Sequence, residues 1–359
     1  MNAIIMAGGY GTRLKSVTGD EPKPMAKLMG KPVLEHILAL LKRNGITTAC
    51  LSLHYRPEVI RDYFGDGSRF GMRLEYHVEE AQLGTAGGVK ACQDFYRDRD
   101  FLVLSGDCAC DFDLRSLMEA HRRHRPAVTM ALAAHDAPMQ YGTVLTDRAG
   151  RVVSFIEKPA WERVVTDLVN TGIYVISPAA MEFVPEREPF DFARDLFPAL
   201  MDAGQTILGV PLKGYWCDIG SPREYFQCNL DALDGKLRLE NPPPMPPSQT
   251  VPARPRPGIV TIAEYRCAGR ARLMRELSQR LMEAGEELQT DFNFGFDLSD
   301  GVGLHLPGCN VCIAPAPDRE ALLISTDETD AARTKALAQG CEDLLRGVEG
   351  AAHGAGEIP

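Results

Sequence analysis

The chain has no apolar run that approaches the length needed to cross a membrane, and its first residues read as a strand rather than a signal peptide. It also lacks an excess of positive charge, because 39 lysines and arginines stand against 49 aspartates and glutamates, for a formal net charge of −10. These absences argue against a membrane protein and a general nucleic-acid binder, although a local group of cations can still form a nucleotide site. We expect a cytoplasmic protein whose 359 residues form two or three domains.

The ten cysteines follow no regular spacing, which favours reduced thiols over a disulfide framework. Two local pairs, Cys108 with Cys110 and Cys309 with Cys312, could each supply two metal ligands. Neither pair has a matching second pair or a histidine cluster nearby. Ordinary buried cysteines are therefore favoured over a zinc site.

The most informative segment is the N-terminal stretch that ends at Pro32. A short apolar run, Ala3 to Met6, is typical of a buried parallel strand. It leads into glycines that permit positive φ and close approach to a ligand, and then into cations of the same loop. The glycines are Gly8, Gly9 and Gly11, and the cations are Arg13, Lys15, Lys23 and Lys27. This pattern predicts a site for phosphate groups.

Two familiar phosphate motifs are excluded by single residues. Gly30-Lys31 is followed by Pro32, whereas the Walker pattern needs serine or threonine there. Leu14 stands where the dinucleotide fingerprint needs its third glycine.

Strands and helices alternate up to about residue 135, which predicts an α/β fold with a doubly wound sheet and right-handed crossovers. After residue 140 strands dominate, so we expect a mixed sheet. In such folds, ligands bind beyond the carboxyl ends of the strands. The expected strands are 49–53, 73–77, 101–104, 142–145, 152–157, 172–176 and 206–210, and the expected helices are 33–43, 57–64, 85–92, 114–123 and 221–233. The first domain is expected to span residues 1–235.

A second domain is expected after a proline-rich linker, residues 236–258, which favours a semi-rigid extended spacer. Residues 259–347 should form a small α+β domain. We expect an amphipathic helix at 269–284, strands at 311–314 and 321–325, and a helix at 330–345. Residues 348–359 are expected to be a disordered tail.

The whole string from Gly8 to Pro32 closely resembles the signature of the sugar-1-phosphate nucleotidyltransferases, and further motifs extend the resemblance to about residue 235. The resemblance implies a Rossmann-like nucleotidyltransferase fold and the transfer of a nucleotidyl group from a nucleoside triphosphate to a sugar 1-phosphate. In that reaction a sugar phosphate oxygen attacks the α-phosphorus and pyrophosphate leaves. The protein contributes mainly positioning and electrostatics, with Mg²⁺ held by carboxylates.

The resemblance assigns roles to five charged residues. Arg13 and Lys23 would face the phosphates, and Lys158 would bind the sugar phosphate. Asp107 follows the apolar strand 101–104 in Ser-Gly-Asp, where a carboxylate is a natural Mg²⁺ ligand, although taken alone it could simply start a turn. Asp218, in Trp-Cys-Asp-Ile-Gly, matches the second metal motif of the family. The two aspartates are far apart in sequence, so the fold must bring them together.

Two sets of binding residues follow from the same resemblance. The nucleotide set is Ala7, Gly8, Gly9, Gly11, Thr12, Arg13, Gln82, Leu83, Gly84, Thr85, Ala86 and Gly106. The sugar-phosphate set is Tyr141, Gly142, Glu157, Lys158, Asn170, Thr171 and Gly172. Taken alone, the segment 83–88 would be a helix N-terminus capped by Thr85, and Glu157 with Lys158 would be an exposed ion pair. Gln82 stands where the family commonly has proline, which leaves the choice of base open.

The C-terminal part resembles the last domain of phosphohexomutases such as phosphomannomutase, on the segments 269–277 and 300–302. Residues 314–319 replace the serine- and threonine-rich phosphate loop of that domain, and its nucleophile and metal domains are missing. Mutase activity is therefore not expected, and a docking, oligomerisation or regulatory role is favoured. The hexapeptide repeat of a left-handed β-helix, which many guanylyltransferases carry, is also missing.

Within the family, the nearest branch is the mannose-1-phosphate guanylyltransferases, which implies GTP, mannose 1-phosphate and Mg²⁺ as partners. Glucose 1-phosphate with UTP or dTTP is the alternative within the class. A catalytically silent nucleotide-sugar sensor is the alternative from another class. A homo-oligomer remains open.

Overall fold

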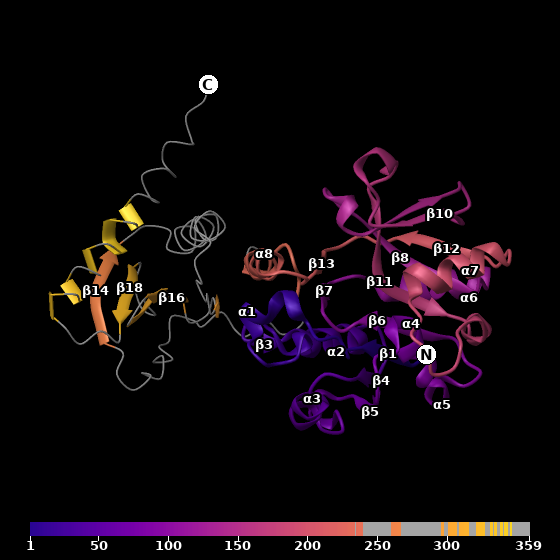
Figure 1. Cartoon of the computed structure of the whole chain (residues 1–359), viewed down its shortest axis with the longest axis horizontal. Coiled ribbons are helices and arrows are strands. Elements are labelled where there is room, and N and C mark those ends of the chain that lie inside the picture. Colours follow the sequence, from indigo (N-terminus) through magenta and orange to yellow (C-terminus); the bar gives the residue numbers. More distant parts are fainter. Residues whose placement is uncertain are drawn as a thin grey trace.

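The computed structural model describes residues 1–233, 235–239, 260–266, 296–297, 301–306, 309–315 and 321–326, and parts of 331–346. A nine-stranded mixed sheet lies at the centre of residues 1–239 (Figure 1). Its strands are β1 (Ala3–Met6), β4 (Thr48–Leu53), β5 (Arg73–Val78), β6 (Phe101–Ser105), β8 (Val128–Ala134), β9 (Gly142–Thr146), β10 (Val152–Glu157), β11 (Leu168–Ile176) and β12 (Ile207–Pro211).

The strand order is β10-β9-β11-β6-β1-β4-β5, with β8 pairing both β11 and β12. Strands β6, β1, β4 and β5 are parallel to one another, whereas β11 joins β6 in the antiparallel direction. Met6 is in register with Ser105, so the loops after β1 and β6 leave the same edge side by side. The expected α/β fold with a doubly wound mixed sheet is therefore confirmed.

Alternate residues of the central strands are buried on opposite faces. Ile5 and Leu104 belong to one apolar cluster, and Ile4 and Val103 belong to the other. Helices cover both clusters, as a doubly wound sheet requires. They are α1 (Lys15–Thr18), α2 (Val33–Arg43), α3 (Pro57–Phe64), α4 (Gly84–Ala91), α5 (Gln93–Tyr96), α6 (Leu114–His124), α7 (Phe197–Asp202) and α8 (Pro222–Leu233). The core on the side of α2 also takes side chains from α6 and α8, and α4 and α7 contribute to the other.

Two small ribbons complete this unit. Strands β2 (Lys27–Leu28) and β3 (Lys31–Pro32) form a hairpin before α2. Strand β7 (Cys108–Cys110) pairs with β13 (Trp216–Asp218), so that Asp218 lies opposite Cys108. Neither ribbon nor β8 was predicted from the sequence. Among the described residues, no helix is both long and apolar enough to span a bilayer.

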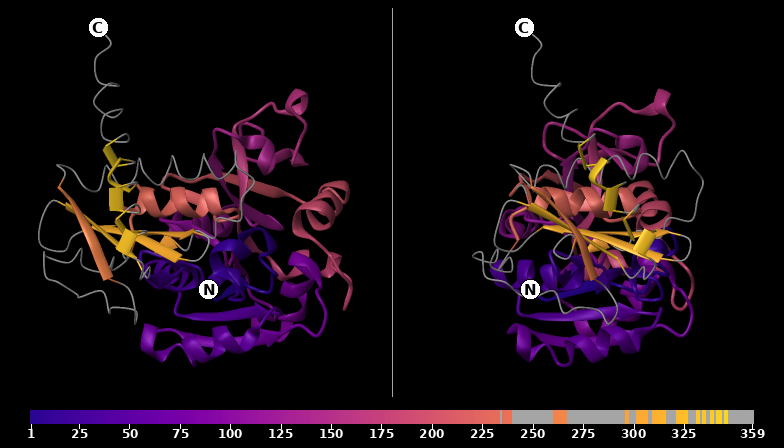
Figure 2. Two further views of the ribbon diagram at one scale, coloured as in Figure 1. Left: turned by 60° about the vertical axis from the view of Figure 1, so that its left-hand side comes forward. Right: turned by 90° about the vertical axis from the view of Figure 1, so that its left-hand side faces the viewer.

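The C-terminal residues that the structure describes form a five-stranded antiparallel sheet, visible as orange to yellow arrows in Figure 2. Its strands are β14 (Val260–Arg266), β15 (Phe296–Asp297), β16 (Gly301–Leu306), β17 (Cys309–Pro315) and β18 (Ala321–Thr326). Strands β17 and β18 contain the predicted segments, and the described helical residues between 331 and 346 overlap the predicted last helix, 330–345, and extend one residue beyond it. The predicted helix 269–284, the linker beyond residue 239 and the tail lie outside the described residues.

Candidate active site

The glycine loop follows β1 and approaches Lys23, which lines the same cavity. Gly11 has a φ of +59°, and a Cβ there would lie 2.8 Å from the Cβ of Lys23. Only glycine combines this left-handed conformation with so close an approach at little strain. The loop enters the short helical turn η1 (Thr12–Leu14), which carries Arg13.

Lys23 lies at the centre of the site. Its Nζ is 2.5 Å from Oδ2 of Asp107 and 3.5 Å from Oδ1 of Asp218. Burial by itself lowers the pKa of the Lys23 ammonium, but the two carboxylates outweigh burial and hold the pKa above its usual value. The two aspartates predicted as metal ligands are therefore brought together, with a cation between them.

The pairing of β7 with β13 explains why residues so distant in sequence meet. Asp107 immediately precedes β7 and Asp218 ends β13, and the backbone N–H of Ile219 donates to the carbonyl of Asp107 at 3.2 Å. The Ser105 hydroxyl donates to Oδ1 of Asp107 at 2.5 Å.

The pKa values of the two carboxyl groups are shifted in opposite directions. Burial raises the pKa of Asp107, yet Lys23 and the Ser105 hydroxyl outweigh burial and keep the pKa below its usual value. Burial, and then the charge of Asp107, raise the pKa of Asp218 to about 6.

Two cavities meet at these residues. The first, of about 240 Å³, is lined by Met6, Ala7, Gly9, Gly11, Thr12, Arg13, Lys23, Pro24, Asp107 and Gly220. The second, of about 310 Å³, is lined by the sugar-phosphate set together with Thr85, Ser105, Asp191, Trp216, Asp218, Glu224 and several neighbours. Both cavities are lined by Met6, Arg13, Lys23 and Asp107. The glycine loop and the sugar-phosphate set thus lie on either side of one group of charged residues.

The second cavity is built around the start of β9 and the end of β10. A Cβ on Gly142 would lie 2.8 Å from Oε2 of Glu157, so a larger residue would displace that carboxylate. Burial raises the pKa of Glu157. Lys158 is exposed, has a φ of +45°, and donates its backbone N–H to the carbonyl of Tyr141 at 3.1 Å. The Thr171 hydroxyl instead donates to the carbonyl of Ala131 at 2.8 Å, inside the sheet.

The segment predicted to bind the base begins α4, and it is held by a distant loop. The Thr85 hydroxyl donates to Oδ2 of Asp191 at 2.7 Å, and the N–H groups of Ala86 and Gly87 both donate to the carbonyl of Phe190. Of the predicted nucleotide set, six residues line neither cavity: Gly8, Gln82, Leu83, Gly84, Ala86 and Gly106.

Glu224, like Asp191, is a charged residue of the second cavity that the sequence did not indicate as part of the site. It lies in the first turn of α8, and its Oε2 accepts the N–H of Gly220 at 3.0 Å. Its charge also contributes to the raised pKa of Asp218. The sequence could have indicated this contact, because Glu224 lies four residues after Gly220 and shortly after the serine and proline at the start of the helix.

A cluster of three aromatic rings lies beside the second cavity, and the sequence did not indicate that these rings lie together. The rings of Tyr141 and Trp216 lie 5.2 Å apart, and that of His135 lies 4.6 Å from Tyr141. Trp216 donates its indole N–H to the carbonyl of Thr171 at 3.1 Å, which fixes the ring against β11.

The residues around Lys23 have the donor chemistry that Mg²⁺ requires. Asp107 and Asp218 offer hard carboxylate oxygens, and the position of Nζ between them demonstrates that this space accepts a cation. Among the residues that the structure describes, no group of three or more His, Cys, Asp and Glu side chains could hold a metal by itself. The remaining ligands would come from water and phosphate oxygens, as is usual for Mg²⁺.

Fold and site together define an α/β protein with a candidate ligand site, lined by glycines, cations and carboxylates, at the carboxyl edge of its parallel strands. The chain belongs to the nucleotidyl transferase family, whose sequence pattern matches residues 2–235.

Two curated relatives illustrate the range within that family. The chain is 35% identical over 251 residues to the UTP–glucose-1-phosphate uridylyltransferase of Synechocystis sp., covering 66% of this chain and 65% of the relative. It is 36% identical over 236 residues to the mannose-1-phosphate guanylyltransferase of Mycobacterium tuberculosis, covering 66% of this chain and 65% of that protein. The chain therefore spans about 65% of the length of these relatives.

Solved structures agree with the observed fold. HddC from Yersinia pseudotuberculosis, complexed with GMP-PN, has a TM-score of 0.56 at 30% identity, covering 64% of this chain and 97% of HddC. A structure described as a putative glucose-1-phosphate thymidylyltransferase from Bacillus anthracis has a TM-score of 0.59 at 22% identity and covers 67% of this chain and 98% of that one, a likeness of fold alone.

Proposed function

We propose that the chain transfers a nucleotidyl group from a nucleoside triphosphate to a sugar 1-phosphate, releasing pyrophosphate and forming a nucleoside diphosphate sugar. The observation that carries this proposal is the meeting of the two cavities at Arg13, Lys23 and Asp107. One cavity opens on the glycine loop and the other on Glu157 and Lys158. A triphosphate and a sugar phosphate bound in them would bring their phosphates together at these charged residues.

The proposed reaction is an in-line displacement. A phosphate oxygen of the sugar 1-phosphate forms a bond to the α-phosphorus of the triphosphate, and the bond from the α-phosphorus to the pyrophosphate oxygen breaks. Arg13 and Lys23 neutralise the negative charge that accumulates, and Lys158 holds the sugar phosphate for attack. Asp107 and Asp218 would hold Mg²⁺, which supplies Lewis-acid neutralisation of phosphate oxygens when it is bound.

We further propose GTP and mannose 1-phosphate as the substrates. Two likenesses support this choice: the guanylyltransferase relative from Mycobacterium tuberculosis, and the HddC structure complexed with GMP-PN. Glucose 1-phosphate with UTP is the second candidate, because the Synechocystis relative is a uridylyltransferase of similar identity.

A matrix of assays tests these proposals. The full chain is incubated with Mg²⁺, each of four nucleoside triphosphates, and either mannose 1-phosphate or glucose 1-phosphate, and pyrophosphate release is measured. The fastest release is expected with GTP and mannose 1-phosphate. Arg13→Ala serves as the active-site control, and Lys27→Gln, at an exposed lysine on β2 that lines neither cavity, as the matched surface control. Release with no combination would refute transfer and favour a catalytically silent nucleotide-sugar sensor.

A further inference from the structure

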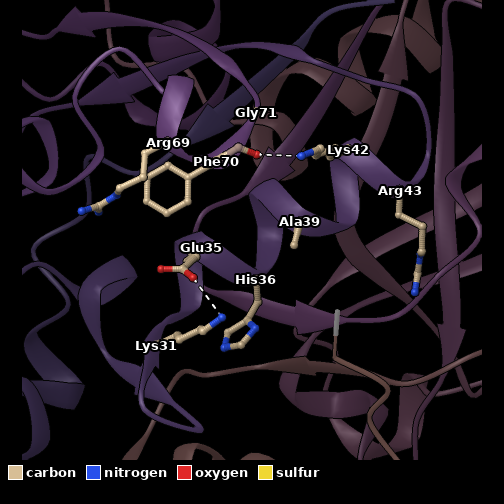
Figure 3. A pocket seen from close by; sticks show the side chains of 9 residues that line it. All are labelled: Lys31, Glu35, His36, Ala39, Lys42, Arg43, Arg69, Phe70 and Gly71. Atoms are coloured by element: carbon tan, nitrogen blue, oxygen red, sulfur yellow. Dashed lines mark hydrogen bonds and ion pairs between the residues drawn. The ribbon is translucent and has the colours of Figure 1, made fainter. Parts of the chain in front are cut away.

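A third cavity, of about 500 Å³, is separate from the candidate active site (Figure 3). It is formed by β3, α2 and the short turn η3 (Ser68–Phe70), and it shares no lining residue with the other two cavities. Its lining residues are Lys31, Glu35, His36, Ala39, Lys42, Arg43, Arg69, Phe70 and Gly71. We call it the basic cavity.

The basic cavity carries a positive charge that contrasts with the chain as a whole. Among the residues that the structure describes, its lining has four cationic side chains and one carboxylate, that of Glu35, in a chain of net charge −10. In Figure 3 the four cations are seen around Ala39. Burial lowers the pKa of His36, so this ring adds no charge at neutral pH.

Two of the cations are held by groups that do not cancel their charge. Lys42 donates from Nζ to the carbonyl of Phe70 at 3.2 Å. Arg69 donates from Nη2 to the carbonyl of Tyr63 at 2.8 Å, and its guanidinium lies 5.0 Å and 4.7 Å from the ring centres of Tyr63 and Phe70. Within the part of the chain that the structure describes, neither Lys42 nor Arg69 has a carboxylate at ion-pair distance.

The carboxylate of the cavity is already engaged. Glu35 forms an ion pair with Lys31 at 3.3 Å and accepts the Tyr63 hydroxyl at 2.9 Å. Backbone carbonyls and aromatic faces therefore fix the positions of Lys42 and Arg69. Glu35 does not neutralise these two cations, so their charge can be neutralised by a bound anion.

We propose that the basic cavity binds a phosphorylated small molecule outside the active site. Fixed guanidinium and ammonium donors match the oxygens of a phosphate group, and arginine can bind them in pairs. The volume lies in the range of small-molecule sites, and the hollow shape does not suit a flat or extended macromolecular surface. The methyl group of Ala39, between the cations, leaves the space open for the ligand.

The test uses inorganic pyrophosphate as the probe, titrated calorimetrically into the full chain without Mg²⁺ or nucleotide. The wild type is expected to bind at two sites, the basic cavity and the candidate active site. The double variant Lys42→Gln/Arg69→Gln should lose at least about tenfold in affinity at one site, because two charge-assisted hydrogen bonds disappear. The matched variant Arg123→Gln/Lys213→Gln removes the same two charges from exposed positions elsewhere and should leave both sites unchanged.

The Arg13→Ala variant separates this proposal from the proposed function. It should weaken the active-site binding and leave the binding that depends on Lys42 and Arg69. If nucleotidyl transfer is absent altogether, the basic cavity should still bind the probe. Equal isotherms for the wild type and Lys42→Gln/Arg69→Gln overturn the proposal.

A second variant, Ala39→Glu, guards against a folding defect in the first. A glutamate there keeps every cation and can pair with Lys42, three residues later on the helix, whereas Arg43 is held by the carbonyls of Asp111 and Phe112. Its melting temperature should equal or exceed that of the wild type while binding at the basic cavity is lost. Repeating the titration with inorganic phosphate and with GDP-mannose distinguishes a simple from an esterified phosphate. Loss of binding in Ala39→Glu for any of these probes supports the site, and loss for none refutes it.

Discussion

Lys23→Gln should destabilise the fold as well as the reaction, because it removes the cation between two carboxylates. The side chains of Lys23, Asp107 and Asp218 are 11%, 27% and 32% exposed, so water screens their charges only in part. Breaking a fully buried ion pair by removing one partner costs about 3–5 kcal/mol, whereas an exposed pair is worth about 0–1 kcal/mol. The intermediate exposure places the loss at roughly 2 kcal/mol.

Urea and thermal unfolding in the presence of EDTA measure this loss. A change of about 2 kcal/mol corresponds to a fall in Tm of roughly 4–8 °C for a domain of this size. The control is Lys27→Gln, because Lys27 is an exposed lysine on β2, and its change should stay within about 0.5 kcal/mol.

Magnesium should partly restore the variant. Without Lys23, the two carboxylates repel each other, and a divalent cation bound between them stabilises the folded state by mass action. The rise in Tm on adding Mg²⁺ should therefore be larger for Lys23→Gln than for the wild type. The double variant Lys23→Gln/Asp107→Asn should be less destabilised than the sum of the two single variants, since the repulsion is gone. Equal stability of Lys23→Gln and Lys27→Gln, or equal responses to Mg²⁺, would refute this reasoning.

Three further predictions concern the reaction and the domain boundary. Arg13→Ala should lower kcat by about 10²–10³ with the fold intact, since a preorganised cation is lost from the phosphates; near-normal turnover in steady-state assays would contradict this. Lys158→Ala should raise KM for the sugar 1-phosphate much more than for the triphosphate, and equal increases would reject that role. A chain that ends at residue 239 should remain folded and active in the pyrophosphate assay. One that ends at Gly235 should lose about 2 kcal/mol in urea unfolding, because the side chain of Leu237, 2% exposed, is removed; equal stability of the two would count against it.

The regular elements that cover the core were predictable because their periodicity reflects one buried face. Helices α2 and α3 begin and end at the predicted residues, and β10 does as well. Strand β8 escaped prediction for the opposite reason. Six of its seven residues are buried, so its sequence Val-Thr-Met-Ala-Leu-Ala-Ala has no alternation of apolar and polar residues to mark a strand.

Four charged residues of the candidate site could be named from the sequence, but their arrangement could not be predicted. Sequence motifs identified Arg13, Lys23, Asp107 and Asp218 as candidate site residues. The resemblance to a family assigned a role to each of them. The bridge of Lys23 between the two aspartates depends on the pairing of two three-residue strands, whose length is too short for any periodic signal. Glu224 was not predicted because its contact with the N–H of Gly220 depends on the local fold of one helix turn. A lone glutamate in the first turn of a helix is usually explained by its favourable interaction with the helix dipole.

Asp111 shows how the geometry of Asp107 and Asp218 depends on residues remote from them. Its Oδ1 accepts the N–H of Tyr215 at 2.7 Å, and its Oδ2 accepts that of Arg238 at 3.0 Å. Its carbonyl accepts Nη2 of Arg43, the last residue of α2, at 2.8 Å. Asp111 directly follows β7 and Tyr215 directly precedes β13. The side chain of Asp111 thus connects the β7–β13 ribbon, which Asp107 directly precedes and Asp218 ends, to the segment after α8. The backbone carbonyl of Asp111 connects the ribbon to α2. The segment after α8 therefore belongs physically to the unit that contains the candidate site as far as Arg238, beyond the boundary that the proline-rich composition indicates.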